Sequence, residues 1–266
     1  MLILVTAMLI AGTVHAADSL SSADKAKLGF TYDFGYMSKW MSRGGEAYSE
    51  NGAFFHTISA DLWGTGFTAS VCHVNPDGGS FVDQSPGVTA SDKQRLNYFV
   101  SYANSFADDS PFKTQYKFTW MYKDWYNQAS KKADYQVWIL GFAWPNLIGH
   151  GVTPKYIMHY DSPAGSGYNN ADKAGFVHRF GVDYKFNVAD LPYPIVLSNE
   201  IAYRDGYGGP TVDHDWSHHT IGLGTKFQLT DNMSLHPNIY HQTTLDNSIN
   251  PNTDDTYCKI NLKYKF

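Results

Sequence analysis

The amino-acid sequence predicts an all-β protein, a transmembrane antiparallel up-and-down β-barrel of about twelve strands. Three observations lead to this prediction. Segments with a period of two, apolar then polar, recur along the chain, as expected for strands that have two different faces. Aromatic residues make up 16% of the chain and gather on one face of most of these segments. Turn residues and glycine-rich stretches separate one segment from the next.

The alternating segments cover most of the chain. We expect strands at 28–43, 53–62, 67–74, 94–104, 114–126, 134–144, 153–160, 176–186, 194–204, 217–229, 233–242 and 256–266. The connections after the second, fourth, eighth and tenth strands are short. Those after the third, seventh and ninth are long, glycine-rich and acidic. Short turns on one side, long loops on the other and an even strand number are typical of an outer-membrane barrel.

A soluble β-sandwich or a lipocalin-like barrel would also show alternation. Such proteins expose polar residues, whereas the presumed outer face here is aromatic over most strands. The opposite face carries charges that a packed core could not hold without pairing. The number of strands also exceeds the roughly eight at which side chains fill the interior of a barrel. These features favour the membrane barrel, with segments 134–144 and 153–160, apolar on both faces, as its least defined strands.

The first residues predict export. Leu2 to Gly12 is an apolar stretch, and Val14-His15-Ala16 has the small-x-small pattern of a signal cleavage site. The stretch is shorter than the about 20 apolar residues of a membrane-spanning helix. No Lys or Arg precedes it, which is atypical of a signal. We expect residues 1–16 to be a secretory signal peptide and residues 17–266 to form a single barrel domain.

The sequence contains no motif for several common kinds of binding site. It has no nucleotide-binding loop, no cysteine spacing typical of a metal site and no basic-aromatic pattern for nucleic acid. We therefore expect no cofactor and no nucleic-acid partner. The two cysteines, Cys72 and Cys258, fall on strands that are not expected to be neighbours, so we also expect no disulfide.

The chain ends with YCKINLKYKF, in which Ile260, Leu262, Tyr264 and Phe266 form an apolar face that closes on an aromatic residue. This ending resembles the C-terminal strand of Gram-negative outer-membrane barrels. The resemblance implies a bacterial outer-membrane location and contact with outer-membrane lipid and lipopolysaccharide. It also implies recognition of the strand ending in Phe266 by the barrel-assembly machinery. A second stretch, YDFGYMSKWMSRGG at 32–45, resembles the first strand of TorF-type outer-membrane porins.

The face opposite the aromatic residues would line the lumen. By parity, the charged residues on that face are Asp33, Asp61, Arg95, Lys117, Lys123, Arg179, Asp183, Lys185, Glu200, Arg204, Lys226, Lys259, Lys263 and Lys265. Basic residues dominate this set although the net charge of the chain is −5. The remaining acids lie in or beside the expected outer loops, at Glu46, Glu50, Asp77, Asp83, Asp161, Asp205, Asp213, Asp215, Asp254 and Asp255.

A basic lumen lowers the electrostatic barrier for anions. The sequence therefore predicts a channel for passive diffusion of small hydrophilic solutes, with some preference for anions. Gly222 and Gly224, predicted to point inward, would either leave room for passage or mark a bend. In the alternative, the charges pair across the lumen, for example Arg179 with Glu200, and the plugged barrel acts as an anchor or adhesin through its acidic loops.

The stretch DHDWSHH at 213–219 is the densest polar cluster. Asp213, His214, Asp215 and His218 are weak candidates for ligands of a divalent metal. Strand spacing puts the two aspartates on one face and the two histidines on the other, so they do not converge. We expect a solvated strand end and no metal.

The same stretch raises a hydrolase as an alternative. Ser217 and His219 share the lipid-facing parity, which resembles outer-membrane phospholipases, where a His and a Ser two residues apart face lipid. Such a pair could act as nucleophile and base on a lipid ester. The order here is reversed, however, and no matching Asn is apparent from the sequence. His178 has the same parity, and we interpret it as an interfacial residue.

Large aromatic residues cluster near the expected strand ends. They are Trp63, Trp125, Trp144, Trp216, Tyr126, Tyr160, Tyr203 and Tyr264. Tryptophan and tyrosine are enriched where a membrane meets water, so these positions predict aromatic girdles.

Overall fold

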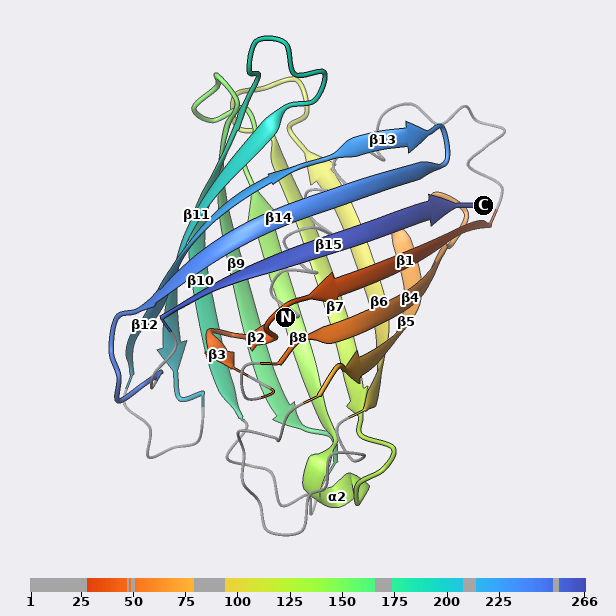
Figure 1. The fold of residues 1–266 in the computed structure, drawn as a ribbon, viewed down its shortest axis with the longest axis vertical. Helices are drawn as coiled ribbons and strands as arrows, with labels where there is room; N and C mark the ends of the chain where they lie inside the picture. The colour runs from red at the N-terminus through yellow and green to blue at the C-terminus, as the bar shows by residue number, and fades with distance from the viewer. Residues whose placement is uncertain are drawn as a thin grey trace.

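The computed structural model describes residues 28–46, 48, 51–78, 94–165, 174–207, 214–250 and 254–266. Its strands form one antiparallel sheet that closes on itself, because β12 pairs with β14 as well as with β11 (Figure 1). The strands are β1 (Gly29–Met37), β4 (Ala53–Asp61), β5 (Phe67–Pro76), β6 (Arg95–Phe106), β7 (Thr114–Asp124), β8 (Tyr135–Ala143), β9 (Val152–Pro163), β10 (Gly175–Phe186), β11 (Ile195–Asp205), β12 (Asp215–Thr225), β13 (Phe227–Thr230), β14 (Met233–Thr244) and β15 (Asp255–Lys265). The predicted closed barrel is confirmed.

The thirteen strands of this sheet correspond to twelve crossings, since β12 and β13 are two parts of one. Both pair with β14 in the same register, Gly224 with Asn238 and Phe227 with Leu235. That register puts Pro237 of β14 opposite Thr225. Proline has no N–H to donate, so the ladder is interrupted where β12 ends. Each of the twelve predicted strands therefore has a counterpart in the structure.

The first predicted strand, 28–43, is too long. β1 ends at Met37, and the chain then leaves the sheet. It forms a short hairpin of β2 (Met41–Ser42) and β3 (Gly45–Glu46), which pair only with each other. The prediction was too long because the aromatic alternation of the sequence continues through Trp40, although residues after Met37 are not part of the barrel wall.

Burial alternates along the strands as the sequence predicts. In β15, Lys259 and Asn261 are buried while Ile260 and Tyr264 are exposed. The outer faces of the other strands likewise expose large apolar side chains, such as Phe180 of β10. An apolar band facing outward over a polar interior is the arrangement of an outer-membrane barrel.

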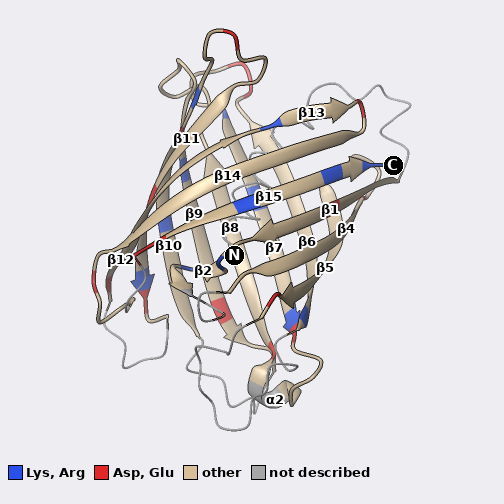
Figure 2. Ribbon diagram, in the orientation of Figure 1, with Lys and Arg blue, Asp and Glu red and all other residues tan. Residues whose placement is uncertain are grey.

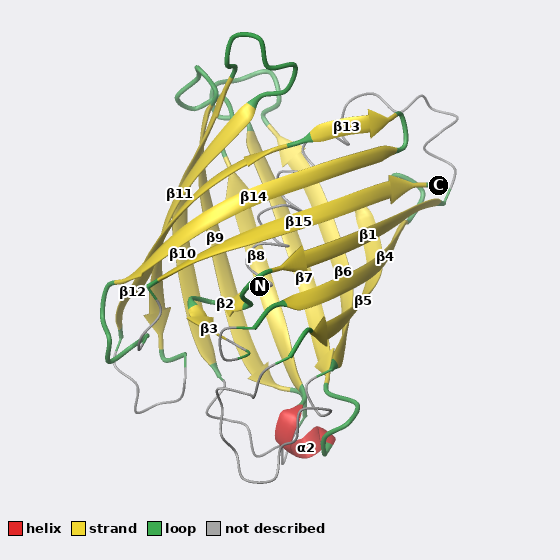
Figure 3. Ribbon diagram, in the orientation of Figure 1, coloured by secondary structure: helices red, strands yellow, loops and turns green. Residues whose placement is uncertain are grey.

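The two ends of the barrel differ. Short turns join β4 to β5, β10 to β11 and β13 to β14, at the end where the chain terminates (Figure 3). The opposite end, called the loop side, carries the longer connections and the helix α2 (Ser130–Ala133). No helix in the described part of the chain is long and apolar enough to span a membrane. The end with the short turns is called the turn side.

The tryptophans predicted to form girdles at the strand ends do not all face outward. Trp63 and Trp216 are exposed at strand ends, as a girdle requires, but Trp125 is buried and packs inside the barrel. Its inclusion in the girdle was therefore wrong, because the chain turns inward directly after β7. Cys72 is buried and Cys258 is exposed, and both thiols are free. The predicted signal peptide at 1–16 lies outside the described residues.

Candidate functional site

The β2–β3 hairpin lies within the lumen and has a two-residue tip. Ser42 pairs with Gly45, and the residues between them have positive φ, 53° for Arg43 and 81° for Gly44. Two left-handed residues form the tight turn that suits a two-residue hairpin. A Cβ on Gly44 would lie 2.1 Å from Nδ1 of His218 on β12, so only glycine fits this approach to the wall.

A buried ion pair holds the tip of the hairpin. Arg43 Nη2 lies 2.8 Å from Asp161 Oδ1, and both side chains are only 1% exposed. Asp161 was expected in or beside an outer loop and was not counted among the lumen residues. β9 continues to Pro163, past the predicted end at residue 160, and places the Asp161 carboxylate in the lumen. Breaking a buried pair of this kind by removing one partner costs about 3–5 kcal/mol.

Backbone carbonyls of the tip accept further hydrogen bonds. Arg204 of β11 donates to the Arg43 carbonyl at 2.9 Å and to Asn250 Oδ1 at 2.9 Å. The Gly44 carbonyl accepts from Gln242 Nε2 of β14 at 2.8 Å and from Asn250 Nδ2 at 2.9 Å. Bonds to β9, β11, β14 and the β14–β15 connection therefore fasten the tip across the lumen.

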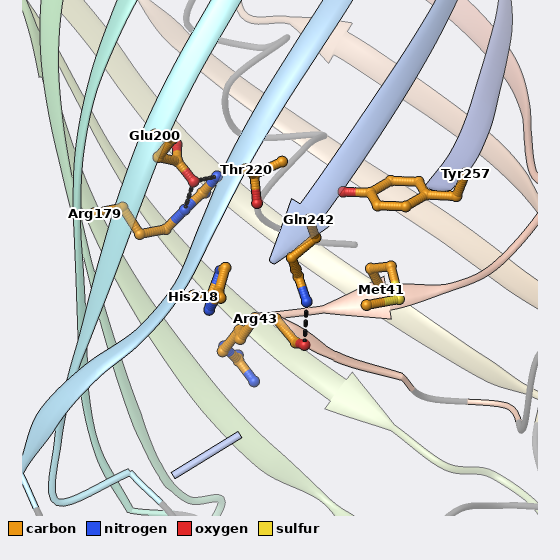
Figure 4. Close-up of a pocket in the computed structure, with 9 residues that line it drawn as sticks. Met41, Arg43, Arg179, Glu200, His218, Thr220, Gln242 and Tyr257 are labelled. Carbon is orange, nitrogen blue, oxygen red and sulfur yellow. Dashed lines mark hydrogen bonds and ion pairs between the residues drawn. The ribbon is translucent and has the colours of Figure 1, made fainter. Parts of the chain in front are cut away.

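A polar cavity lies between the tip and the wall made by β10, β11, β12, β14 and β15 (Figure 4). Nine residues line it, Met41, Arg43, Gly44, Arg179, Glu200, His218, Thr220, Gln242 and Tyr257. Arg179 Nε donates to Glu200 Oε1 at 2.5 Å. This cross-strand pair was predicted in the plugged-barrel alternative, and its formation is confirmed. The two arginines of the cavity therefore each have a carboxylate partner.

The other side of the hairpin packs tightly against the wall. Trp40 and Tyr48 are fully buried with ring centroids 4.6 Å apart, and Trp40 meets Phe55 of β4 edge-on at 5.6 Å. The Arg95 guanidinium carbon lies 4.1 Å from the Trp40 ring centroid and 4.8 Å from that of Trp125. The hairpin and the aromatic residues around it thus occupy part of the loop-side half of the lumen.

The turn-side half of the lumen contains several lysines, and Figure 2 shows where Lys and Arg lie along the strands. Lys117 of β7 is buried, and Lys263 of β15 pairs in register with Asp33 of β1. Asp33 also accepts a hydrogen bond from Asn261 at 2.7 Å.

The predicted lumen residues fall into three groups by exposure. Arg95, Lys117, Lys123, Arg179, Glu200, Arg204 and Lys259 are buried, Asp33, Asp183 and Lys263 are half-buried, and Asp61, Lys185, Lys226 and Lys265 are exposed. Asp61, Lys185 and Lys265 lie at the turn-side ends of their strands, and Lys226 lies between β12 and β13. Which of these residues line an open path stays a prediction.

Sequence reasoning missed several residues of the lumen. Arg43 was assigned to the end of a strand. Lys155, which pairs with Asp183 at 2.6 Å, and the fully buried His159 both lie on β9. The predicted strand 153–160 was apolar on both faces, so its parity could not be read. The Arg-Gly pair between short apolar segments was the one local signal for the hairpin.

A β-bulge changes the faces at the start of β12. Ala202 of β11 pairs with His218 and Tyr203 pairs with Trp216, so Ser217 is an extra residue. As a result Ser217 and His218 are both buried, and Ser217 Oγ lies 2.8 Å from His218 Nδ1.

His219, the other member of the proposed hydrolase pair, is directed elsewhere. Its Nε2 lies 3.1 Å from Oδ1 of Asn199 on the neighbouring strand. The structure therefore does not bring Ser217 and His219 together on the lipid-facing side, and that expectation was wrong. The cause is the bulge, because one extra residue inverts the faces of everything that precedes it.

The weak metal candidates do not converge either. Within the described ranges, no three His, Cys, Asp or Glu side chains form a group that could hold a metal ion. His214 Nδ1 lies 2.6 Å from Asp205 Oδ1, Asp215 is exposed, and His218 faces the cavity. Asp213 lies outside the described residues.

The inward glycines of β12 do not create open space. A Cβ on Gly222 would lie 2.5 Å from Tyr240 and Ser198 Oγ, and one on Gly224 would lie 2.0 Å from Asn238 Oδ1. The expectation of room for passage at these positions was wrong, because side chains of the adjacent strands fill it.

Comparison with known proteins gives the fold. No protein-family model and no curated protein matches the chain. A solved structure described as "KdgM porin" matches with a TM-score of 0.52 at 11% identity, over 89% of this chain and 99% of that one. A NanC porin structure matches with a TM-score of 0.51 at 11% identity, over 89% and 100%. The closed barrel and these likenesses together show that the chain has the β-barrel fold of these porin structures.

Proposed function

We propose that this protein is an outer-membrane channel through which small hydrophilic solutes diffuse passively, with a preference for anions. The chain would be exported through the periplasm after loss of residues 1–16. The structural neighbours named as porins support a channel, and the charges of the lumen support the preference.

The observation that carries the proposal is the lysine excess in the turn-side half. In the described part of the chain, no carboxylate lies within 4.0 Å of Lys117, Lys226 or Lys263. Asp33 is the acid nearest in register to Lys263. In a narrow, low-dielectric tunnel, unpaired cations of this kind attract anions and repel cations.

The narrow part of the lumen beside the β2–β3 hairpin would set the size limit for solutes. At the hairpin tip, Arg43 is paired with Asp161 and Arg179 with Glu200, so these four residues add little net charge. The hairpin occupies much of the cross-section, which favours small solutes. Selection by charge and selection by size would therefore reside in different halves of the lumen.

Membrane partners follow from the outer surface. The exposed apolar strand faces would contact outer-membrane lipid and lipopolysaccharide. Phe266 donates its backbone N–H to the carbonyl of Phe30 at 3.0 Å, so the chain end joins the first strand. The exposed Phe266 side chain would remain available to the barrel-assembly machinery while the barrel closes.

Planar-bilayer recording tests the proposal. Under a potassium chloride gradient, the wild type should conduct with a reversal potential that indicates anion preference. In the double variant K117Q/K263Q, the reversal potential should move toward zero. Lys113→Gln is the matched control, because Lys113 pairs with Asp108 in a turn outside the lumen. Absence of conductance would refute the channel, and cation preference would refute the role of the lysines.

A second candidate function is favoured by the hairpin itself. If the β2–β3 hairpin closes the lumen permanently, the barrel is plugged and serves as an anchor or adhesin. The buried Arg43–Asp161 pair supports this reading. In that case the wild type would not conduct, whereas variants that displace the hairpin would conduct.

A further inference from the structure

Two buried polar side chains behind the hairpin have no hydrogen-bond partner for several of their atoms among the residues that the structure describes. Arg95 is 4% exposed and Asn97 is 1% exposed, and both lie on the inner face of β6. Within the described ranges, Arg95 Nε and Nη2 and both polar atoms of the Asn97 amide have no partner. Buried polar groups are almost always satisfied, so four orphan atoms on two neighbouring side chains need an explanation.

The surroundings of Arg95 explain its position but not its unbonded N–H groups. The guanidinium lies between the rings of Trp40, from the hairpin segment, and Trp125, from the chain after β7. Cation–π contacts of this kind involve the faces of the guanidinium plane. The N–H groups project from the edge of that plane, so these ring contacts do not supply them with a hydrogen-bond acceptor.

A second basic residue lies beside the amide. Asn97 pairs in register with Lys123 of β7 on one side and with Cys72 of β5 on the other. Lys123 Nζ donates to Tyr135 Oη at 2.5 Å, so the ammonium group is held at the wall.

The site lacks a negative charge of its own. Among the described residues, no carboxylate lies within 4.0 Å of the Arg95 guanidinium, and Asp161 is already paired with Arg43. A buried cation without a counter-charge is strongly disfavoured. Ordered water could satisfy the N–H groups but would not balance the charge.

We propose that a small monovalent anion, of the size of a halide, binds at the guanidinium edge of Arg95 and the Nδ2 group of Asn97, close to Lys123. The anion neutralises the buried charge. It also stabilises the contact between Arg95 and Trp40, and so holds the hairpin segment against the β5–β7 wall. The site is a structural one, and its occupancy does not depend on whether the barrel conducts.

Thermal unfolding of the purified full chain in detergent tests this site. Sodium bromide is compared with sodium gluconate at equal ionic strength, since gluconate is too large for a buried halide-sized site. The Tm of the wild type should be several degrees higher in bromide. Asn97→Ala should reduce this difference, and Arg95→Gln should abolish it. Lys113→Gln, in a turn, should retain it in full.

Crystals soaked in bromide provide a second readout that needs no variant. Anomalous density between Arg95 and Asn97 is expected. A Tm that does not depend on the anion, or density for water alone, would overturn the proposal. If Arg95→Gln does not fold, the proposal is still tested by the Tm difference between bromide and gluconate in the wild type and in Asn97→Ala. Because these measurements involve no transport, a channel that fails to conduct would leave their outcome unaffected.

Discussion

The two halves of the lumen are built on the same strands but hold different chemistry. The loop-side half contains the β2–β3 hairpin, stacked tryptophans and the ion pairs Arg43–Asp161 and Arg179–Glu200. The turn-side half contains no such insertion in the described part of the chain, and its lysines outnumber its acids. The comparison teaches that a connection folded inward, rather than the wall itself, determines where a barrel of this size is narrow.

The difference has an electrostatic side as well. Where the hairpin fills the lumen, water is scarce, so charges need partners close by. Lys226 and Lys265 in the turn-side half are exposed, so solvent stabilises them without a carboxylate.

Replacing Asp161 by Asn should have the largest effect. It leaves Arg43 buried without its partner, and we expect a loss of about 3–5 kcal/mol in unfolding free energy. The hairpin tip should also detach and single-channel conductance should rise. Denaturant unfolding in detergent and bilayer recording measure the two effects.

Asp255→Asn is the matched control for this substitution. Asp255 pairs with Lys39 at 2.7 Å, but both side chains are partly exposed, so its loss should be about 0–1 kcal/mol. Equal losses for the two variants would mean that the loop-side half is not the dry region described here.

Gly44→Ala should have an intermediate effect. The new Cβ would meet the His218 ring at 2.1 Å, in a backbone conformation with φ of 81°. We expect a loss of about 1–3 kcal/mol from strain, with a displaced hairpin and higher conductance. Gly149 provides a control that has backbone strain without displacement of the hairpin. Its φ is 76°, yet nothing lies within 4 Å of a Cβ there. Gly149→Ala should destabilise without any change in conductance, and a rise in conductance for both would contradict the role of the tip.

Changes to the turn-side lysines should have the smallest effect on stability. For K117Q/K263Q we expect a change below about 1 kcal/mol in unfolding free energy, because no ion pair is lost. The reversal potential should nevertheless move toward zero. The loop-side counterpart R179Q/E200Q removes one charge of each sign, so its reversal potential should stay at the wild-type value. A larger shift of the reversal potential in R179Q/E200Q than in K117Q/K263Q would mean that the loop-side half, and not the turn-side half, selects by charge.

Most of the fold could be predicted because alternation is a local property. The period of two identifies a strand and its two faces from neighbouring residues alone, as in β15, where Lys259 and Ile260 point in opposite directions. The same pattern identified the Arg179–Glu200 pair, since adjacent strands bring these side chains together. The prediction failed where the period was hidden, as on β9, or interrupted by an extra residue, as at Ser217.

The sequence by itself determined the strands, the direction of their faces, the even number of crossings and the basic inner wall. These follow from the spacing of side chains along an extended backbone, which no tertiary contact is needed to define. Only the tertiary structure decided that the segment after Met37 folds into the lumen and that Asp161 meets Arg43 there. Those two residues are 118 positions apart in the printed sequence (161 minus 43), and only closure of the barrel brings them together.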